Sequence, residues 1–383
     1  MASGNSAQIM WGVESTPGVY VPPTAANPLL PGESLMIEQQ VLKSGAIIAG
    51  KRFPTSDQVN GGNIVVSGEF QVEVYNRGLG KLMRLWTGAC NTTGSGPYTH
   101  VFTAGDPTDD AMTIQVGLPS SGGTIHPKSL SGCMADSFSI AGKAGEIVTA
   151  GTSIVGMKGH IGSRTAADGT TTNLSTTVTS AANAAFTQAD VGKPISGTGI
   201  PAGAYITAVA SGTSCTISAA ATASATVTIT IGLALASASY LSTQLPYKFS
   251  HGSLSLFGSS IANCSAFTID GANNLAKERR FMSKYAGQAL EGGLREYTGT
   301  LTLEFDSIAQ LERMAAGSEG ALSLALTSGA DSATIAGNIH YSPWTPTVTG
   351  RDILTQEIPF EFIGSSTDAS AFTMTIVNAD SAA

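Results

Sequence analysis

Two stretches of the chain share one pattern of hydrophobic and polar positions. Between Gly61 and Gly88, apolar side chains first alternate with polar ones and then recur at helical spacing. The alternation predicts a half-buried strand, and the helical spacing predicts a short helix that Gly88 would end. The apolar positions are Phe70, Val72 and Val74 in the strand, and Leu79, Leu82, Met83 and Trp86 in the helix.

The same pattern returns at a constant offset of 231 residues (292 − 61). Gly61, Gly62, Gly68 and Glu73 correspond to Gly292, Gly293, Gly299 and Glu304, and the apolar strand positions correspond to Leu301, Leu303 and Phe305. Ser307 and Gln310 have capping-box spacing ahead of the second helix. Two unrelated amphipathic units could look alike by chance, but matched identities in one ungapped run favour an internal duplication.

Further strands are predicted around both units, so the fold class is mainly β, an α+β pattern dominated by antiparallel sheet. In the first half we expect strands at 34–38, 99–102, 113–116, 137–140 and 146–157. In the second half we expect them at 266–270, 321–327, 332–340, 353–362 and 372–377.

The region between the halves differs in composition. No Asp, Glu, Lys or Arg occurs from Pro194 to Tyr247, and alternating apolar positions are separated by glycines. This pattern predicts a small all-β, Ig-like module inserted in a loop and lying outside the main body. A flexible linker is the weaker alternative because Phe186, Val191 and several isoleucines supply a core.

The amino-terminal segment contains many prolines and is predicted to be an irregular arm. Trp11 and Tyr20 are too large and apolar to remain in water, so the arm either packs on its own body or docks on a neighbour. We expect it to become ordered on assembly. The predicted divisions are an arm at 1–32, a first domain at 33–162, the module at 163–231 and a second domain at 232–383.

Composition and charge limit the possible functions. Charged residues make up only 12% of the chain, and the net charge is −8. A low charge content suits large subunit contacts, and a negative balance argues against gripping nucleic acid, which needs Lys and Arg. The start of the chain lacks the basic and apolar regions of a signal peptide, and we expect synthesis in a cytoplasm without membrane insertion.

No motif in the sequence indicates catalysis. The histidines and cysteines are scattered, and the glycines between Gly197 and Gly203 fit turns better than a phosphate loop. We therefore expect no enzyme activity, no cofactor and no metal. The repeated Glu73 and Glu304 suggest a catalytic carboxylate pair, but a duplicated structural position explains them equally well without a reaction. We expect them to lie at similar radii in an assembly, facing its interior or a subunit seam.

Two basic residues precede aromatic ones at comparable places in the halves, and they are candidates for subunit contact. They are Arg52 before Phe53 and Arg280 before Phe281. A phosphate site is the weaker interpretation, because the chain is acidic and these clusters lack interleaved aromatics. A solvated hairpin, or salt bridges to a neighbouring subunit, fits these residues better.

The residues from Trp11 to Gly18, the proline-rich segment after them and the repeated strand–helix units resemble major tail tube proteins of long-tailed, non-contractile bacteriophages. The segment from Phe186 to Ile206 resembles small β modules of phage virion proteins. The resemblance implies tandem β-sandwich or barrel domains, each flanked by one helix. It also implies self-assembly into stacked rings that form a tube for genome ejection.

The duplicated core departs from the single-domain pattern of this family and predicts rings of three chains with pseudo-sixfold symmetry. Further expected partners are the terminator, tip and tape-measure proteins of the tail, with DNA passing through unbound. An alternative function is a non-enzymatic surface or adhesin-type β protein, although that would need an export signal. A glycan-degrading enzyme would need carboxylates gathered in a groove.

Overall fold

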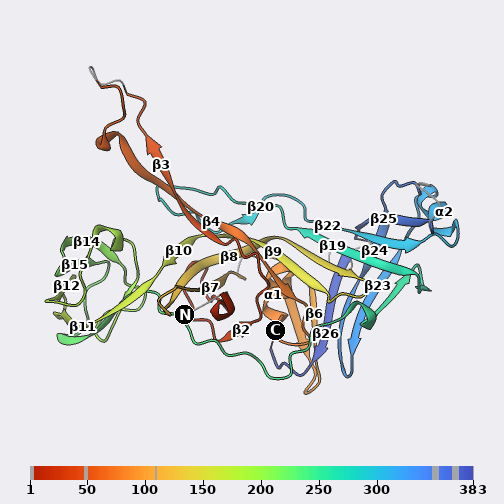
Figure 1. Ribbon diagram of the computed structural model, residues 1–383, viewed down its shortest axis with the longest axis horizontal. Coiled ribbons are helices and arrows are strands. Elements are labelled where there is room, and N and C mark those ends of the chain that lie inside the picture. The colour runs from red at the N-terminus through yellow and green to blue at the C-terminus, as the bar shows by residue number, and fades with distance from the viewer. Residues whose placement is uncertain (1–3, 47–50, 108–109, 347–352, 365–370, 383) are drawn as a thin grey trace.

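The computed structural model describes residues 4–46, 51–107, 110–346, 353–364 and 371–382. The chain is mainly β, and its α-helices in these ranges are α1 (Gly80–Thr87) and α2 (Ala309–Ala315). Figure 1 shows a small lobe at one end of the molecule, β23, β25 and α2 at the other, and a hairpin projecting from the body between them. Short 3-10 turns are η1 (Gly4–Ser6), η2 (Ser56–Gln58), η3 (Gln188–Asp190) and η4 (Phe249–His251).

Most strands belong to one large antiparallel sheet. Its strands in the first half are β1 (Gln8–Val13), β2 (Ala25–Asn27), β3 (Met36–Lys43), β4 (Val59–Glu73), β5 (Gly88–Thr93), β6 (Tyr98–Ala104), β7 (Met112–Pro119), β8 (Ile125–Lys143), β9 (Thr149–Gly156) and β10 (Lys158–Ile161). Those in the second half are β17 (Gly252–Leu256), β18 (Ser259–Ile261), β19 (Cys264–Ala272), β22 (Glu296–Glu304), β23 (Glu319–Ser328), β24 (Asp331–Tyr341), β25 (Thr355–Phe362) and β26 (Phe372–Asn378). A separate two-stranded ribbon pairs β20 (Leu275–Ala276) with β21 (Leu290–Glu291).

The two halves join edge to edge within this sheet. Consecutive pairings run β3–β4–β9–β8–β19–β22–β25–β24, and the link between the halves is β8 with β19. Asn273 N–H donates to the Asp136 carbonyl at 2.8 Å at one end of that link, and Ala144 N–H donates to the Ser265 carbonyl at 2.9 Å at the other. The sheet is therefore continuous from one copy to the other.

Strand register confirms the repeat that the sequence predicts. Gly68 lies opposite Ile154 in the β4–β9 pair, and Gly299 lies opposite Phe360 in the β22–β25 pair. A Cβ on Gly68 would lie 2.5 Å from the Ser34 carbonyl oxygen, and one on Gly299 would lie 2.6 Å from the Thr268 carbonyl oxygen. Each repeated glycine thus lets the preceding strand of its own half approach closely.

The helix α1 closes the first half because its apolar face meets the core side of the sheet. Trp86 is fully buried, stacks on Phe138 with ring centroids 5.0 Å apart, and donates its Nε1 proton to Thr152. Gly88 ends the helix with a φ of +90°, as its position in the sequence predicts. The expected capping box of α2 is wrong: Ile308 is the N-cap, and the Gln310 side chain accepts a hydrogen bond from Tyr341 Oη instead.

The amino-terminal segment is only partly irregular, because two stretches of it are strands of the main sheet. Its strand β1 pairs with β7 along its whole length and with β2 on its other side. Trp11 is 1% exposed and packs near Phe70 in the main core. The expectation that this segment becomes ordered only on assembly is wrong, because β1 pairs with a strand of its own chain. That strand lies about a hundred residues away in sequence, so no local pattern predicts the pairing.

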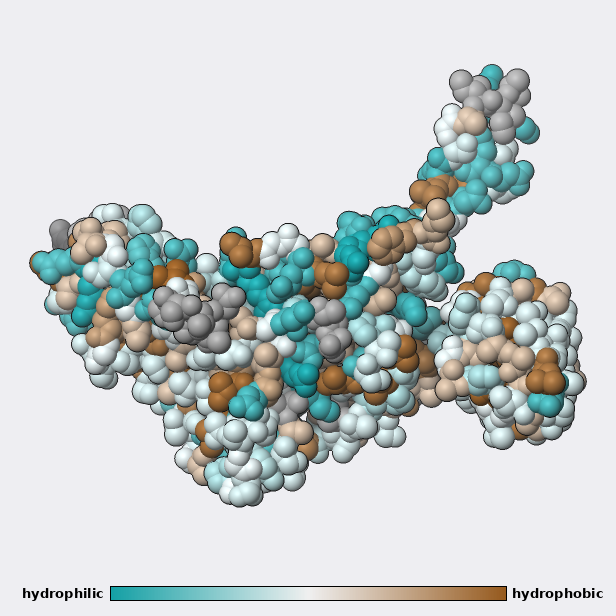
Figure 2. All heavy atoms as spheres, turned by 180° about the vertical axis from the view of Figure 1, so that it is seen from behind, coloured by the Kyte–Doolittle hydropathy of each residue, from teal (hydrophilic) through white to brown (hydrophobic). Residues whose placement is uncertain are grey.

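The lobe in Figure 1 is a separate six-stranded sheet. Its strands are β11 (Ser163–Thr171), β12 (Thr177–Ser180), β13 (Ile195–Ser196), β14 (Ile206–Ser211), β15 (Ser214–Ile217) and β16 (Ala225–Gly232). It has its own core, which includes Phe186, Ile195 and Ile229. Figure 2 shows its surface as mostly pale, because small residues of intermediate hydropathy cover it. The division into four domains stays a prediction.

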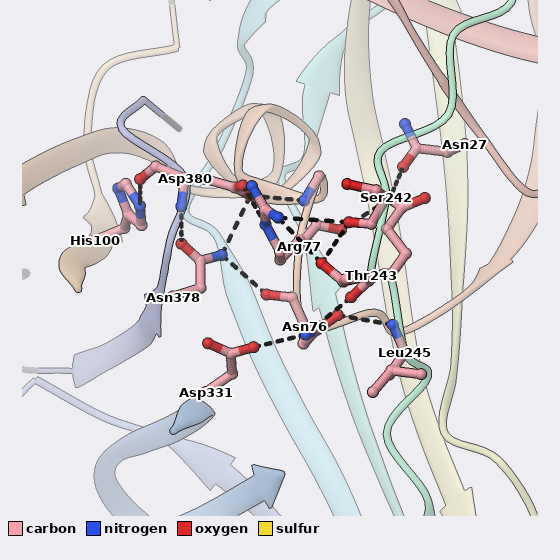
Figure 3. Close-up of polar contacts among 12 residues, drawn as sticks. Asn27, Asn76, Arg77, His100, Ser242, Thr243, Leu245, Asp331, Asn378 and Asp380 are labelled. Carbon is pink, nitrogen blue, oxygen red and sulfur yellow. Dashed lines mark hydrogen bonds and ion pairs between the residues drawn. The ribbon is translucent and has the colours of Figure 1, made fainter. Parts of the chain in front are cut away.

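A polar cluster also connects the two halves beside α1 (Figure 3). Arg77 Nε pairs with Asp380 Oδ1 at 2.8 Å, so the turn after β4 is tied to the end of the chain. Asn76 donates to Asp331 Oδ2 at 2.6 Å, and its Oδ1 accepts from Leu245 N–H. These contacts fix the first half, the segment that follows the lobe and the second half to one another.

Candidate functional site

The main sheet has one face that packs on the core and one polar face that points away from it. We call the second surface the polar face, and define it by the outward residues of β4, β9, β8, β19, β22 and β25. They are Glu69, Gln71, Glu73, Thr149, Gly151, Ser153, Ser137, Ser139, Ala141, Lys143, Ala266, Thr268, Asp270, Ala272, Glu296, Thr298, Thr300, Thr302, Glu304, Thr355, Glu357, Pro359 and Glu361.

Rows of this face cross both halves without interruption. In one row, register places Glu69 opposite Ser153, Ser153 opposite Ser137, Ser137 opposite Ala272, and Ala272 opposite Glu296. Carboxylates therefore lie at both ends of a row of small side chains, about 19 Å apart over four strand spacings. The two copies contribute to one surface.

The polar face is hollowed where the halves meet. A depression of about 390 Å³ lies over β4, β9, β8, β19 and β22, and Glu69, Ser139, Asp270 and Glu296 are among its lining residues. A concave sheet that presents small Ser, Thr and Ala side chains can form part of the wall of a channel. It is open to one side, unlike a closed ligand pocket, which encloses its ligand.

The charged residues of the polar face are almost all negative. It carries carboxylates from four strands, and among its residues the sole Lys or Arg is Lys143. The carboxylates are Glu69, Glu73, Asp270, Glu296, Glu304, Glu357 and Glu361. His340 of β24 lies beside Glu361, with a closest nitrogen–oxygen distance of 3.9 Å. Such a surface repels phosphates and offers few cations to retain them.

Glu73 and Glu304 occupy equivalent register positions, as the repeat predicts. Glu73 is opposite Thr149 in the β4–β9 pair, and Glu304 is opposite Thr355 in the β22–β25 pair. Glu73 accepts a hydrogen bond from Tyr75 Oη at 2.5 Å, whereas Glu304 is exposed. Burial, followed by the hydrogen bond to Glu73, raises the pKa of the Tyr75 phenol, which keeps it protonated as the donor.

Two of the expected subunit-contact residues belong to the amino-terminal segment. Trp11 must be withdrawn as a contact, because its ring is enclosed in the core of its own chain. Tyr20 is half-buried, and its Oη accepts a hydrogen bond from Gln115 Nε2 at 3.1 Å.

The four remaining residues lie on the two segments that lead into β4 and β22. Arg52 and Phe53 are exposed on the β3–β4 hairpin, where Phe53 is 84% exposed. Arg280 is held within its own chain, because it pairs with Glu278 and donates to the Ile64 carbonyl. Phe281 is exposed beneath the Arg279 guanidinium. Whether Phe53 and Phe281 contact another subunit stays a prediction.

The described ranges hold neither a metal cluster nor a membrane-spanning helix. In the described ranges, no group of three or more His, Cys, Asp or Glu residues is placed to hold a metal ion. None of the helices in those ranges is long and apolar enough to cross a bilayer.

Sequence reasoning missed most acidic residues of the polar face. Glu69 could have been found, since it shares the outward phase of Glu73 in the alternating stretch. Asp270 and Glu296 required the β8–β19 and β19–β22 pairings, which no local pattern gives.

Two comparisons with known proteins bear on the family of the chain. A family model of phage tail tube proteins matches the chain twice, over residues 4–218 and 199–362. A search of curated proteins gives no match. The two matches together extend over most of the chain and accord with the duplication seen in the strand register. The chain therefore belongs to the phage tail tube protein family.

Proposed function

We propose that this chain assembles with copies of itself into stacked rings, and that the polar face lines the bore of the resulting tail tube. The observation that carries the proposal is the continuous acidic and concave face to which both halves contribute. DNA passing through such a bore meets like charge and small side chains, so it slides without being held. The chain performs no catalysis in this role.

A ring of three chains is the arrangement that the duplication favours. Each chain contributes two strand–helix units with matching register, and the β8–β19 pairing already joins them. Three chains then provide six similar units around the bore. Closed rings are built from repeated heterologous contacts, and here half of those contacts are internal to the chain.

The proposal also assigns roles to the β3–β4 hairpin and to the lobe. The β3–β4 hairpin projects from the body in Figure 1 and is a means of reaching an adjacent ring. The lobe of residues 163–232 projects at one end and would decorate the outside of the tube. The protein would be made in the cytoplasm of a host bacterium and end in the virion tail, next to the terminator, tip and tape-measure proteins.

Assembly of the purified full-length chain tests the proposal. Negative-stain microscopy should show hollow tubes or rings, and native mass spectrometry of the smallest closed species should give three times the chain mass. A chain that remains monomeric at high concentration in all conditions would contradict self-assembly. Rings of six chains would contradict the trimer and leave the conduit function standing.

A further inference from the structure

The two halves of the chain are joined a second time, through β6 and β26. β26, in the second half, pairs antiparallel with β6 of the first half, from Thr373 opposite Thr103 to Asn378 opposite Tyr98. β26 also pairs with β24, and β6 with β5, so the β5–β6 hairpin extends a sheet of the second half. Figure 1 shows β6 and β26 side by side.

This second joint and the β8–β19 pairing lie on opposite sides of the core. Phe372 of β26 packs against Phe138 of β8, with ring centroids 6.2 Å apart, and against Tyr297 of β22 at 4.6 Å. Met374 of β26 and Phe267 of β19 line the same small apolar cavity. Packed sheets lie about 10 Å apart, so the thickness of the core separates the two joints. Two parts held by one strand pairing can bend about it, whereas two pairings on opposite sides of a packed core resist bending.

The hairpin that makes the second joint occurs in one copy of the repeat. α1 is followed by β5 and β6 and only then by β7, which pairs with β8. α2 leads into β23, which pairs with β24, through residues 316–318. Residues 309–341 all lie in the described ranges. The β5–β6 hairpin is therefore an addition to the first copy, and it reaches across to the second.

Asp380 fastens the end of this joint (Figure 3). Its Oδ1 accepts a hydrogen bond from Arg77 Nε at 2.8 Å, and its Oδ2 accepts one from Gly78 N–H at 2.8 Å. Its main-chain carbonyl accepts a hydrogen bond from His100 Nε2 at 2.9 Å, so the Thr92 hydroxyl donates to Nδ1 of the same ring. One residue of the second half thus holds both the turn before α1 and the strand β6.

Two further hydrogen bonds hold the same turn. Asn378 Nδ2 donates to the Asn76 carbonyl at 2.9 Å, and Asn76 Nδ2 donates to Asp331 Oδ2 at 2.6 Å. Asn76 and Asn378 are buried, and the Asp380 side chain is 15% exposed. Hydrogen bonds to carboxylates are short and strong, and burial protects them from screening by salt. The turn before α1 is therefore held from β24, from β26 and from the residues after β26.

From this we propose that the β5–β6 hairpin and Asp380 form a staple that fixes the angle between the two halves, and that this angle sets the curvature of the polar face in the ring. The proposal rests on the proposed function. With the staple open, the halves are joined through β8 and β19, and the angle between them is free to vary. A ring closes only when the rotations at its joints add to a full turn. Chains with a variable angle therefore form open arcs and rings of other sizes.

The staple gives the ring two kinds of joint. Within a chain, the halves are held by the sheet and by the staple. Between chains α2 cannot supply the same staple, because residues 316–318 lead directly into β23. The stiff joint thus lies inside each chain, and the duplication brings the curvature of the ring under the control of intramolecular contacts.

Removing the two carboxylates that hold the turn tests the staple in the full-length chain. Asp331→Ala and Asp380→Ala are combined, and the variant is assembled beside the unmodified protein. Native mass spectrometry and class averages of negatively stained particles count closed rings of the unmodified size, open arcs and rings of other sizes. The variant loses hydrogen bonds to charged groups, so the ratio of irregular species to regular rings should rise about tenfold or more.

The unassembled variant gives a second measurement that does not depend on rings. Amide exchange of β6 and β26 should become about tenfold faster, while exchange of β8 and β19 stays as in the unmodified chain. The matched control is Asp57→Ala with Asp306→Ala, which removes the same charge from one exposed position in each half. It should change neither measurement.

A covalent clamp across the second joint tests the cause of any defect. Val101→Cys and Thr375→Cys lie opposite each other on β6 and β26 and point away from the core. Opposite residues of an antiparallel pair lie close enough for a disulfide. Added to the double-alanine variant, the oxidised clamp should restore regular rings, and the reduced clamp should not.

Regular rings in unchanged proportion from the double-alanine variant would overturn the staple and leave the proposed function intact. Irregular assembly that the oxidised clamp does not correct would overturn it as well. If the double-alanine variant does not fold, Arg77→Gln, which removes the ion pair with Asp380, decides the question in the same assays. Failure of the unmodified chain to form any ring or tube would overturn both proposals.

Discussion

The carboxylate of Glu14 holds the amino-terminal segment on the body, and replacing it with glutamine is the most direct test of that role. Glu14 is 1% exposed. Its oxygens accept hydrogen bonds from Gly18 N–H at 2.6 Å, Thr113 Oγ1 at 2.7 Å and Gly132 N–H at 2.9 Å. These donors come from the segment itself, from β7 and from β8, so one side chain joins three parts of the first half.

The magnitude follows from what Glu14→Gln leaves behind. The amide offers one acceptor oxygen in place of two and directs an NH₂ group at a buried donor. An unsatisfied buried donor costs about 1–3 kcal/mol, and hydrogen bonds to a charged acceptor contribute about 1.5–3 kcal/mol each. Relief of the buried charge offsets part of this loss. We expect a net destabilisation of about 2–4 kcal/mol.

The pH dependence has a defined sign. Burial raises the pKa of Glu14 despite its hydrogen bonds to Gly132, Thr113 and Gly18. A carboxyl group whose pKa is higher in the folded state than in the unfolded state destabilises the fold when it is charged. The free energy of unfolding therefore rises as the pH falls through the raised pKa. The difference in stability between wild type and Glu14→Gln should therefore be larger at pH 5 than at pH 7.

Hydrogen exchange of β1 and its flanking residues, together with denaturant unfolding followed by tryptophan fluorescence, measures the effect. A local loss of 2–4 kcal/mol corresponds to about thirtyfold to several hundredfold faster exchange. Glu357→Gln, an exposed change on β25, is the control and should alter stability by less than about 0.5 kcal/mol. If Glu14→Gln is no less stable than this control, the carboxylate does not anchor the segment.

Three further predictions concern the polar face and the lobe. Glu69→Lys with Glu296→Lys should make assembled tubes retain DNA in a salt-dependent manner, measured by co-sedimentation, whereas Thr298→Ser should not; equal retention by both would contradict the bore assignment. Asp190→Asn should destabilise the lobe by about 3–5 kcal/mol, because Asp190 is 1% exposed and pairs with Arg164 and Lys193. Burial acts against ionisation of Asp190, but its hydrogen bonds, above all to Arg164, keep its pKa lowered. The stability that the charged carboxylate contributes should therefore be lost as the pH falls below about 4. A lobe that hydrogen exchange shows to be equally stable at pH 2 and pH 7 would refute this. Replacing residues 163–231 by a short Gly/Ser linker should preserve tubes and remove surface projections in micrographs, and loss of assembly with both halves folded would show that the lobe bridges subunits.

The sequence by itself determined the local units and their repetition. Alternation at Phe70 and Val72 and helical spacing up to Trp86 are local patterns with a fixed structural meaning, so β4 and α1 were predictable. The repeated Gly68 and Gly299 were visible as identities, and the structure supplies their reason in the close approach of a neighbouring strand. The core of the lobe was equally visible in its isoleucines.

Only the tertiary structure decided what lies beside what. The pairing of β1 with β7 buries Trp11, and the pairing of β8 with β19 unites the two copies, but each brings together segments about a hundred residues or more apart. Strand register across such distances depends on many weak contacts summed over the whole sheet, not on the pattern of either strand. The polar face arises in the same way, because its acidic rows are made of residues that become neighbours only when the sheet is complete.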